Sequence, residues 1–467
     1  MRRSVIHGAV AALTALACLA GAAPAVADEP AGNPRPCLVE VPAGTSCVEG
    51  SLPDSTPYRF VVPSGWNGAV LVDLDFAGRP LDDPYIARML DRGFAMGGTT
   101  RTVTGWRLTA AAGNQAAALE RFVAAFGEPR WAIASGSSMG GMISALTAQR
   151  HPESFDAAVP FCGGLGGAVG QWNQKLDTVF TLKTLLFPGS DLPVTGIPAD
   201  IEGARQAWQS SLARAQTTPE GRARIALAAA IGQLPSWGHT ASGTPTPMPD
   251  PGDTAALQEG MYLALSGGAL PYIGQAMSSR HTIERLAGGN PSWNTGVDYA
   301  EQLAAAEPRQ RRAVGELYRR AGLDLRADLR TLAGTSRIAA DPGAVEYLER
   351  TGVFTGDIRI PVLTVNPIGD QISTVAQQQA YESVVRASGN GALLRQSYVR
   401  TAGHCTFSTG EREAAIAAIM HRLRTGHWDG MTTPATLNSL AESAPGAEQG
   451  RYLPYRPARF NRPYFGA

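Results

Sequence analysis

Three side chains of this sequence could together carry out nucleophilic catalysis, and the first is a serine. Ser138 stands at the centre of a G-x-S-x-G pattern, Gly136-Ser137-Ser138-Met139-Gly140. An apolar segment at 131–134 precedes the pattern and a helical segment at 141–149 follows it. A sharp strand-to-helix turn exposes a serine hydroxyl, and small residues on both sides leave room for that turn. We therefore predict that Ser138 is a nucleophile; a turn of small residues needed only for packing is the alternative.

A serine hydroxyl needs a base to take its proton and an acid to orient the base. Asp370 lies just past the apolar segment 360–365, at the end of a predicted strand. Ligands gather at the carboxyl ends of parallel strands, so we predict that Asp370 is the acid rather than a simple turn former. Asp357 is its rival, but Asp357 precedes the same segment and would lie at the opposite edge of the sheet.

The position of the base follows from the same reasoning. His404 lies in the loop after the apolar segment 394–400, so it follows a predicted strand that comes later in the chain than Asp370. The other histidines stand in the N-terminal segment, at the end of the helix after Ser138, in the middle of the chain or near its end: His7, His151, His239, His281, His421 and His427. We predict that His404 is the base, with a structural loop histidine as the alternative.

Composition excludes several classes of protein. The chain has 467 residues, 44% of them hydrophobic, and its 40 Lys and Arg balance 40 Asp and Glu. A disordered chain would have few hydrophobic residues and a high net charge, and a nucleic-acid binder would usually carry an excess of basic residues. Lysine occurs only at 175 and 183, which we interpret as the coding bias of a GC-rich genome.

The sequence contains no H-E-x-x-H motif and no paired C-x-x-C, so we expect neither a metal nor a cofactor.

The N-terminus has the pattern of a secretory signal peptide. Met1-Arg2-Arg3 is positive, an apolar run covers 9–23, and Ala25-Val26-Ala27 offers a small-x-small cleavage site. We predict a signal peptide at 1–27 and a secreted, extracellular protein with no stable membrane span; a membrane anchor is the alternative.

The cysteines become informative once export is expected, because exported proteins meet oxidising conditions. Four remain after cleavage at this site: Cys37, Cys47, Cys162 and Cys405. Three pairings are possible in principle. Cys37 and Cys47 are close in sequence, with Pro and Gly between them, so a local loop is natural and would leave Cys162 with Cys405.

Apolar segments alternate with helical segments over two stretches of the chain, which indicates an α/β fold with a parallel sheet covered by helices on both faces. The expected strands are 58–63, 69–76, 93–97, 131–134, 157–161, 360–365 and 394–400. The expected helices of this domain are 84–92, 112–126, 141–149, 374–388 and 411–424.

A long insertion separates the two stretches. We predict a core domain at 28–164 and 356–427, a mostly helical lid insertion at 165–355, and a Pro-rich C-terminal tail at 428–467. Helical pieces of the insertion are expected at 203–215, 220–231, 255–266, 298–306, 311–321 and 341–351. Its aromatic residues could line an apolar pocket, although each could equally pack the insertion's own core: Trp172, Trp208, Trp237, Tyr262, Tyr272 and Trp293.

These residues resemble the alpha/beta-hydrolase family over most of the mature chain apart from the insertion and tail. Ser138, Asp370 and His404 match the family's nucleophile, acid and base in order and context. The pair His404-Cys405 also resembles the tannase and feruloyl esterase group, in which a disulfide bridges the neighbours of the Ser and His. Ser137 stands here where that group has a Cys. The segments 290–294, 298–299 and 403–405 resemble exported actinobacterial hydrolases.

The resemblance implies further roles. One oxyanion donor would be the Met139 N–H, and the other would come from the loop Asp75-Phe76-Ala77-Gly78, with Phe76 or Ala77 as donor. The His that often begins this loop in the family is replaced here. The resemblance also leads us to predict a Cys162–Cys405 disulfide that holds the His404 loop.

The implied reaction is acyl transfer to water on a small-molecule ester or other short acyl substrate, with carboxylic esters as the first expectation. A serine aminopeptidase or amidase of the same fold is the alternative, and it would need acidic residues of the insertion to bind a free amine: Glu202, Glu259 and Glu301 are available. A hydrolase that has lost its activity and only binds a ligand is the non-enzyme alternative; it predicts loss of one of the three catalytic residues.

Overall fold

The computed structural model describes residues 35–443, 446 and 448–466. The predicted signal peptide at 1–27 lies outside this range. Within it, no helix combines the length and the apolar character needed to cross a membrane.

A ten-stranded sheet forms the centre of the fold, in the order β1-β2-β3-β5-β4-β6-β7-β8-β9-β10. The strands are Arg35–Pro36 (β1), Thr45–Ser51 (β2), Pro57–Pro63 (β3), Ala69–Val72 (β4), Ala95–Thr99 (β5), Trp131–Ser137 (β6), Ala157–Phe161 (β7), Val362–Gly369 (β8), Leu394–Ala402 (β9) and Tyr452–Leu453 (β10). Neighbouring strands from β5 to β9 run parallel, whereas β1, β2, β3 and β10 pair antiparallel with their neighbours. This is the sheet of an alpha/beta-hydrolase, as the sequence predicted.

Each central strand buries both of its faces, which explains its nearly continuous apolar sequence. In β4, Val70 and Val72 pack into the core on one face of the sheet, and Ala69 and Leu71 pack into the core on the other. Helices α2 (Leu108–Phe126), α3 (Met139–Arg150) and α13 (Val375–Ala387) supply side chains to the first of these cores. Helices α1 (Pro84–Asp91) and α14 (Thr409–Thr425) supply the second.

Local sequence signals set the ends of these helices. Asp83 accepts hydrogen bonds from the backbone N–H groups of the first turn of α1. At α14, the Ser408 hydroxyl and the Glu411 carboxylate form a reciprocal capping box, and Gly426 ends the helix in the left-handed conformation. The capping box places the N-cap residue of α14, Ser408, four residues after His404 and so limits the length of the histidine loop.

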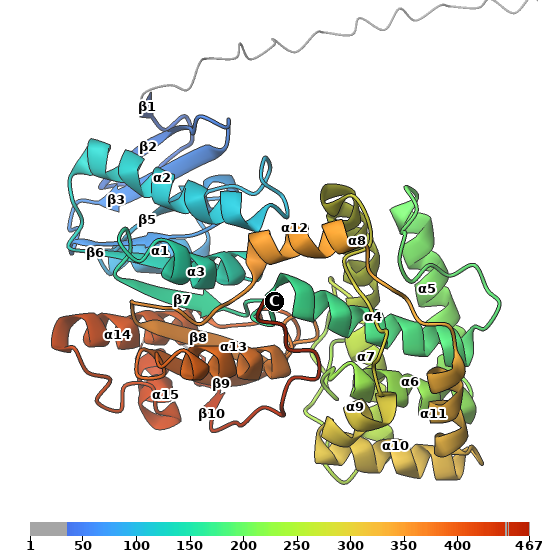
Figure 1. Ribbon diagram of the computed structural model, residues 1–467. Helices are drawn as coiled ribbons and strands as arrows, with labels where there is room; N and C mark the ends of the chain where they lie inside the picture. The colour runs from blue at the N-terminus through green and yellow to red at the C-terminus, as the bar shows by residue number, and fades with distance from the viewer. Residues whose placement is uncertain (1–34, 444–445, 447, 467) are drawn as a thin grey trace, which may run out of the picture.

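The segment between β7 and β8 is helical, and in Figure 1 most of it lies beside the sheet rather than over its faces. It comprises α4 (Gly167–Leu186), α5 (Ile201–Gln216), α6 (Pro219–Ile231), α7 (Thr254–Ser266), α8 (Tyr272–Ala287), α9 (Tyr299–Ala305), α10 (Pro308–Arg320), α11 (Leu325–Gly334) and α12 (Pro342–Gly352). The helices of this segment have a hydrophobic core largely of their own, centred on the Ala-rich α6. Helices α4, α8 and α11 were absent from the sequence prediction.

The C-terminal tail is more ordered than its sequence suggested. It contains the helix α15 (Pro434–Glu442), and β10 adds a strand to the sheet beside β9. Beyond β10, Phe460 packs against Ala376 and Ala380 of α13. Arg462 pairs with Asp177 of α4 at 2.7 Å and donates to the carbonyl of Trp293. The tail thus crosses from the sheet domain to the helical segment and contacts both.

Two disulfides are present. Cys37 pairs with Cys47 of strand β2, and Cys162 just after β7 pairs with Cys405 in the histidine loop. Both pairings agree with the prediction from sequence and resemblance.

Candidate active site

Ser138 occupies the sharp turn between β6 and α3. Its backbone has φ 60° and ψ −120°, a conformation that costs energy for a residue with a side chain. The Ser138 N–H donates to the Phe161 carbonyl at the end of β7 with a length of 3.0 Å, which holds the turn against the neighbouring strand. The turn places the hydroxyl at the carboxyl edge of the sheet and at the N-terminus of α3, where the helix dipole stabilises negative charge.

The close packing of this turn explains its glycines. A Cβ atom on Gly136 would lie 2.5 Å from Asp73 Oδ1 and 2.8 Å from the backbone of Gly140. A Cβ atom on Gly140 would lie 3.1 Å from the same carboxylate oxygen. The G-x-S-x-G spacing is therefore a steric requirement of the turn.

The structure brings together the three predicted residues. His404 Nε2 lies 2.7 Å from Ser138 Oγ, and His404 Nδ1 lies 2.8 Å from Asp370 Oδ2. These residues come from β6–α3, β8–α13 and β9–α14, three connections that meet at one edge of the sheet. If the Nδ1 atom carries the proton, Nε2 is free to accept the serine proton.

Asp370 is held in a fixed orientation. Its Oδ1 atom accepts hydrogen bonds from the N–H groups of Ile372 and Ser373, at 2.8 and 2.9 Å. Its side chain is fully buried, whereas that of His404 is 10% exposed. A buried carboxylate held by backbone donors favours one tautomer and one ring orientation of the histidine.

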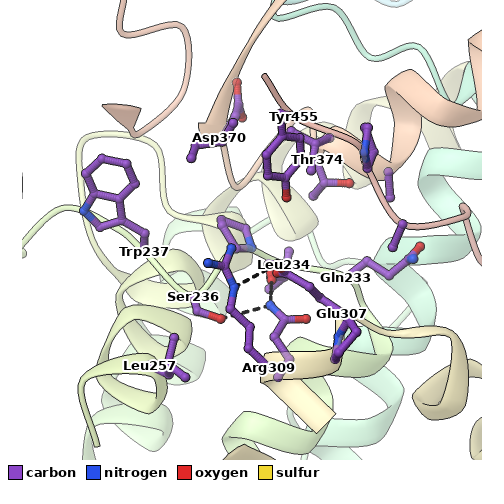
Figure 2. Close-up of a pocket in the computed structure, with 18 of the residues that line it drawn as sticks. Gln233, Leu234, Ser236, Trp237, Leu257, Glu307, Arg309, Asp370, Thr374 and Tyr455 are labelled. Atoms are coloured by element: carbon purple, nitrogen blue, oxygen red, sulfur yellow. Dashed lines mark hydrogen bonds and ion pairs between the residues drawn. The ribbon is translucent and has the colours of Figure 1, made fainter. Parts of the chain in front are cut away.

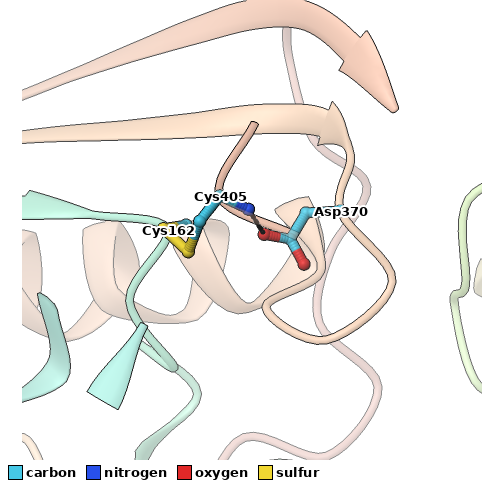
Figure 3. Close-up of side chains that lie close together, drawn as sticks. All are labelled: Cys162, Asp370 and Cys405. Atoms are coloured by element: carbon cyan, nitrogen blue, oxygen red, sulfur yellow. Dashed lines mark hydrogen bonds between the residues drawn. A yellow bond between two sulfur atoms is a disulfide. The ribbon is translucent and has the colours of Figure 1, made fainter. Parts of the chain in front are cut away.

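The Cys162–Cys405 disulfide fixes the residue that follows His404. Figure 3 shows the disulfide beside Asp370, and the Cys405 N–H donates to Asp370 Oδ2 at 3.4 Å. Cys405 has φ 60° and Cys162 has φ 45°. Cys162, Asp370 and Cys405 lie close enough together to suggest a metal site. The two sulfur atoms are bonded to each other, so neither cysteine can offer a thiolate to a metal ion.

The predicted oxyanion donors differ in what they already bind. The Phe76 N–H, in the 3-10 turn η1 (Phe76–Gly78), donates to the Asp73 carbonyl at 3.4 Å. For the Ala77 N–H, no hydrogen bond within the described part of the chain is found. Met139 is the first residue of α3, so its N–H has no partner inside the helix. Ala77 is thus freer than Phe76 to act as the second donor.

Ion pairs hold the loop that carries Ala77. Arg79 lies 3.2 Å from Asp73, and Arg101 Nε donates to Asp75 at 2.9 Å. Burial raises the pKa of Asp73 to about 6, and Arg79 opposes this rise. On the other side of the serine turn, the partly buried Arg412 donates to Ser137 Oγ at 2.8 Å. Neither Asp73 nor Arg412 was predicted to act at the site, and the contact of Arg412 with Ser137 joins residues 275 positions apart in the sequence.

A cavity of about 290 Å³ borders Asp370 (Figure 2). Trp237 and Leu257 line it from the helical segment, Thr374 from the start of α13 and Tyr455 from the tail. Of the six aromatic residues proposed to line a pocket, Trp237 lies here. Trp172, Trp208 and Tyr272 are fully buried in hydrophobic cores, Trp293 packs against Tyr464, and Tyr262 packs against the core of the helical segment.

Other candidates lie away from the three residues. Asp357 is exposed and pairs with Arg359. Glu202, Glu259 and Glu301 are all exposed on helices, and none of them lines the cavity at Asp370. His281 contacts the Ile197 carbonyl, and His421 pairs with Asp429.

Two residues of the helical segment approach the site without having been predicted. The His239 ring contacts Gly403, since a Cβ atom on that glycine would lie 2.4 Å from the ring. Lys175 of α4 is fully buried, and Asp370 is one of the charges that act on it. Because lysine is rare in this chain, Lys175 could have been noticed in the sequence. The sequence interpretation attributed the rarity to coding bias and gave Lys175 no role.

Comparison with known proteins identifies relatives over most of the chain. Residues 53–232 match a tannase-like family of unknown function (DUF6351). The chain is 34% identical over 433 residues to an o-phthalyl amidase of Xanthobacter agilis, covering 86% of this chain and 93% of that protein.

Solved structures show more distant likeness. An esterase from Aspergillus oryzae is 12% identical with a TM-score of 0.36, covering 82% of this chain and 80% of that one. The rice cell wall degrading esterase LipA from Xanthomonas oryzae is 10% identical with a TM-score of 0.33, covering 83% and 88%.

The match to the amidase covers most of both chains, and the tannase-like match includes the serine turn. The chain therefore belongs to the same family as the o-phthalyl amidase of Xanthobacter agilis, shares a tannase-like segment over residues 53–232, and is a hydrolase of the esterase or amidase kind.

Proposed function

We propose that the protein is a serine hydrolase that cleaves a carboxylic ester or amide through the residues Ser138, His404 and Asp370. The observation that carries the proposal is the continuous hydrogen-bonded arrangement of Ser138 Oγ, the His404 ring and the Asp370 carboxylate. A chain that had lost its activity and only bound a ligand would not need to retain all three groups at these distances.

The proposed reaction has two halves. Ser138 Oγ attacks the substrate carbonyl carbon while His404 Nε2 takes the hydroxyl proton. The tetrahedral intermediate then expels the alcohol or amine, which leaves with the proton from His404, and an acyl-serine ester remains. Water attacks this ester with His404 as base, and the acid is released as Ser138 regains its proton. Asp370 keeps the imidazole oriented and stabilises its charged form.

The N–H groups of Met139 and Ala77 would stabilise the oxyanion. Each such donor contributes about 3–4 kcal/mol to transition-state stabilisation in related chemistry. The ion pairs of Asp73 with Arg79 and of Asp75 with Arg101 support this role, because they fix the loop before the substrate arrives. We also propose that the helical residues 165–355 act as a lid over this edge.

Two leaving groups are candidates. Esters remain the first expectation from the resemblance, since an ester forms the same acyl-serine intermediate as an amide and has the better leaving group. The relative named as an o-phthalyl amidase favours amides of an aromatic acid as the second candidate. The exposed positions of Glu202, Glu259 and Glu301 give no support to an aminopeptidase that binds a free amine.

We further propose that the protein acts outside the cytoplasm. The predicted signal peptide and the two disulfides support this, because disulfides persist mainly in oxidising compartments. The substrate would then be a small molecule met outside the cell.

A substrate panel tests the proposal. Oxidised protein from Asp28 onward is assayed on 4-nitrophenyl esters of increasing chain length and on 4-nitroanilides, and is treated with a fluorophosphonate probe. We expect turnover and labelling in the wild type, and loss of both in Ser138→Ala. Ser144→Ala is the matched control, because Ser144 carries a buried hydroxyl on the same helix, α3, and this hydroxyl donates to the Gly140 carbonyl rather than to a residue of the site. Activity or labelling that survives in Ser138→Ala would refute the assignment of the nucleophile.

A further inference from the structure

Lys175 is an unusual residue for the interior of a protein. Its side chain is fully buried in α4, and its ammonium nitrogen has no hydrogen-bond partner within the described residues. An ammonium group has three donors, and a buried charge that is not compensated is costly. The other lysine, Lys183, lies two turns later on the same helix and donates to Ser190.

Two aromatic rings surround the ammonium group. The Lys175 nitrogen lies 5.3 Å from the centre of the Trp172 ring and 4.8 Å from the centre of the Tyr272 ring. Ring faces attract a cation, so this environment favours a charged group although it supplies no carboxylate. Trp172 in turn packs edge-on against Trp106, which lies in the loop after β5.

The charges around Lys175 leave its own charge uncompensated. Burial and, to a smaller extent, the neighbouring Arg280 lower the pKa of Lys175 to about 7, although Asp370 opposes the decrease. Arg280 has partners of its own in the Ser292 hydroxyl, the Trp172 carbonyl and Glu284. Asp370 is engaged by His404 and two backbone N–H groups. No anionic side chain in the described structure forms an ion pair with Lys175.

Helix α4 is anchored next to the predicted acid. The side-chain amide of Gln174, the residue before Lys175, donates to the Thr374 hydroxyl at 3.0 Å. The oxygen of the same amide accepts a hydrogen bond from the Gln377 side chain. Thr374 ends the loop that starts at Asp370. In Figure 1, α4 lies between the sheet and the rest of the helical segment. The ammonium group is therefore held in a fixed place beside the reaction centre rather than at a distant surface.

We propose that the Lys175 ammonium binds a carboxylate carried by the acyl part of the substrate, so that the enzyme acts on monoesters or monoamides of dicarboxylic acids. This inference rests on the proposed function, since it assumes that Ser138 attacks an acyl group. A carboxylate fits because it supplies the missing counter-charge on a small planar group. An o-phthalyl group, which the amidase relative is named for, is an acyl group of this kind.

Paired substrates test this selectivity. One pair consists of the 4-nitroanilides of 2-carboxybenzoic and 2-methylbenzoic acid, and the other of the 4-nitrophenyl esters of 3-carboxybenzoic and 3-methylbenzoic acid. Within each pair the charge differs but the size is similar. We expect the wild type to prefer the carboxylated substrate, and Lys175→Met to reduce kcat/KM for that substrate by about 10- to 100-fold. The methyl substrates should react at unchanged rates.

Lys183→Met is the matched control, because it removes the other lysine of the same helix at a partly exposed position. It should leave both substrates unaffected. A Lys175→Met variant that lowers kcat/KM equally for the charged and methyl substrates would show a structural role and overturn the proposal. So would an unchanged preference for the carboxylated substrate.

A binding measurement separates this inference from the proposed function. Benzene-1,2-dicarboxylate and benzene-1,3-dicarboxylate are titrated calorimetrically into Ser138→Ala and into Ser138→Ala combined with Lys175→Met. We expect the second change to raise Kd at least about tenfold. Equal Kd values would overturn the carboxylate site even if Ser138 is the nucleophile. Full turnover by Ser138→Ala would overturn the proposed function, and the binding result would still decide the role of Lys175.

Discussion

Removing the Cys162–Cys405 disulfide tests how the fold positions His404. The perturbation is the double substitution Cys162→Ala with Cys405→Ala, which deletes the link but leaves the histidine and its acid in place. In the native structure the linked residue follows His404 directly, and its N–H contacts Asp370. We expect two losses, one in stability and one in catalytic rate, with separate physical causes.

The stability loss follows from the length of chain that the link closes. The two cysteines are 243 residues apart, and the chain-entropy relation then gives about 5.5 kcal/mol of stabilisation at 25 °C. The Cys37–Cys47 link closes only 10 residues and gives about 2.7 kcal/mol by the same relation. The rate loss has a local origin: without the link, the His404 ring can leave the line between Ser138 and Asp370. A displacement of about 1 Å can lower a rate by about 100-fold.

The assay combines urea unfolding with kcat on the best substrate of the panel. Cys37→Ala with Cys47→Ala is the control, because that link holds the outer strand β2 and lies away from the site. The control should lose stability and keep kcat. If the Cys162–Cys405 variant keeps the wild-type kcat, or loses no more stability than the control does, the reasoning is wrong.

Three further predictions follow from single contacts. Asp370→Asn should fold and lower kcat by about 10⁴-fold, measured by steady-state kinetics, because the amide favours the wrong histidine tautomer; a fall of less than tenfold would contradict the role of Asp370. Gly136→Ala should lower the free energy of unfolding by about 1–3 kcal/mol in urea, because its Cβ would lie 2.5 Å from Asp73 Oδ1; unchanged stability would show that the turn can yield. The pKa of Lys175 falls from 10.5 to about 7 on folding, so the unfolded chain binds more protons between these pH values and wild-type stability rises with pH. Lys175→Met should therefore be more stable than the wild type by up to roughly 5 kcal/mol at pH 7 and below, and the difference should vanish by pH 10.5 in unfolding titrations; a constant difference would contradict the shift.

Much of the sheet could be predicted because its central strands are buried on both faces and therefore read as short apolar runs. The strands β4, β6, β7 and β8 were all expected near their observed positions. The edge strands β1 and β10 and the adjoining β2 were not expected; β1 and β10 have only two residues each, and β2 is rich in Thr, Ser and Gly and only half buried. Edge strands obtain their order from pairing with a neighbour, and a single sequence carries little record of that pairing.

Helix α4 shows why the site was only partly predictable. It is buried on nearly all sides, so it lacks the alternation of apolar and polar faces that identifies a surface helix. Its polar residues are satisfied by distant partners, as Gln174 is by Thr374 and Asp177 is by Arg462. The serine, acid and histidine could be found because each stands next to a strand with a strong pattern. Lys175 stands in a helix that has none, and its burial depends on packing that the sequence alone does not reveal.

The pairing of Asp177 with Arg462 has a consequence for the order in which the protein matures. Burial raises the pKa of Asp177, and Arg462 is the cation that opposes this rise. During synthesis α4 leaves the ribosome long before residue 462, so a buried carboxylate must wait for its partner until nearly all of the described chain has emerged. The tail then fastens the helical segment to the sheet. A protease that cuts between β10 and Arg462 would undo this step while leaving Ser138, His404 and Asp370 on the same polypeptide.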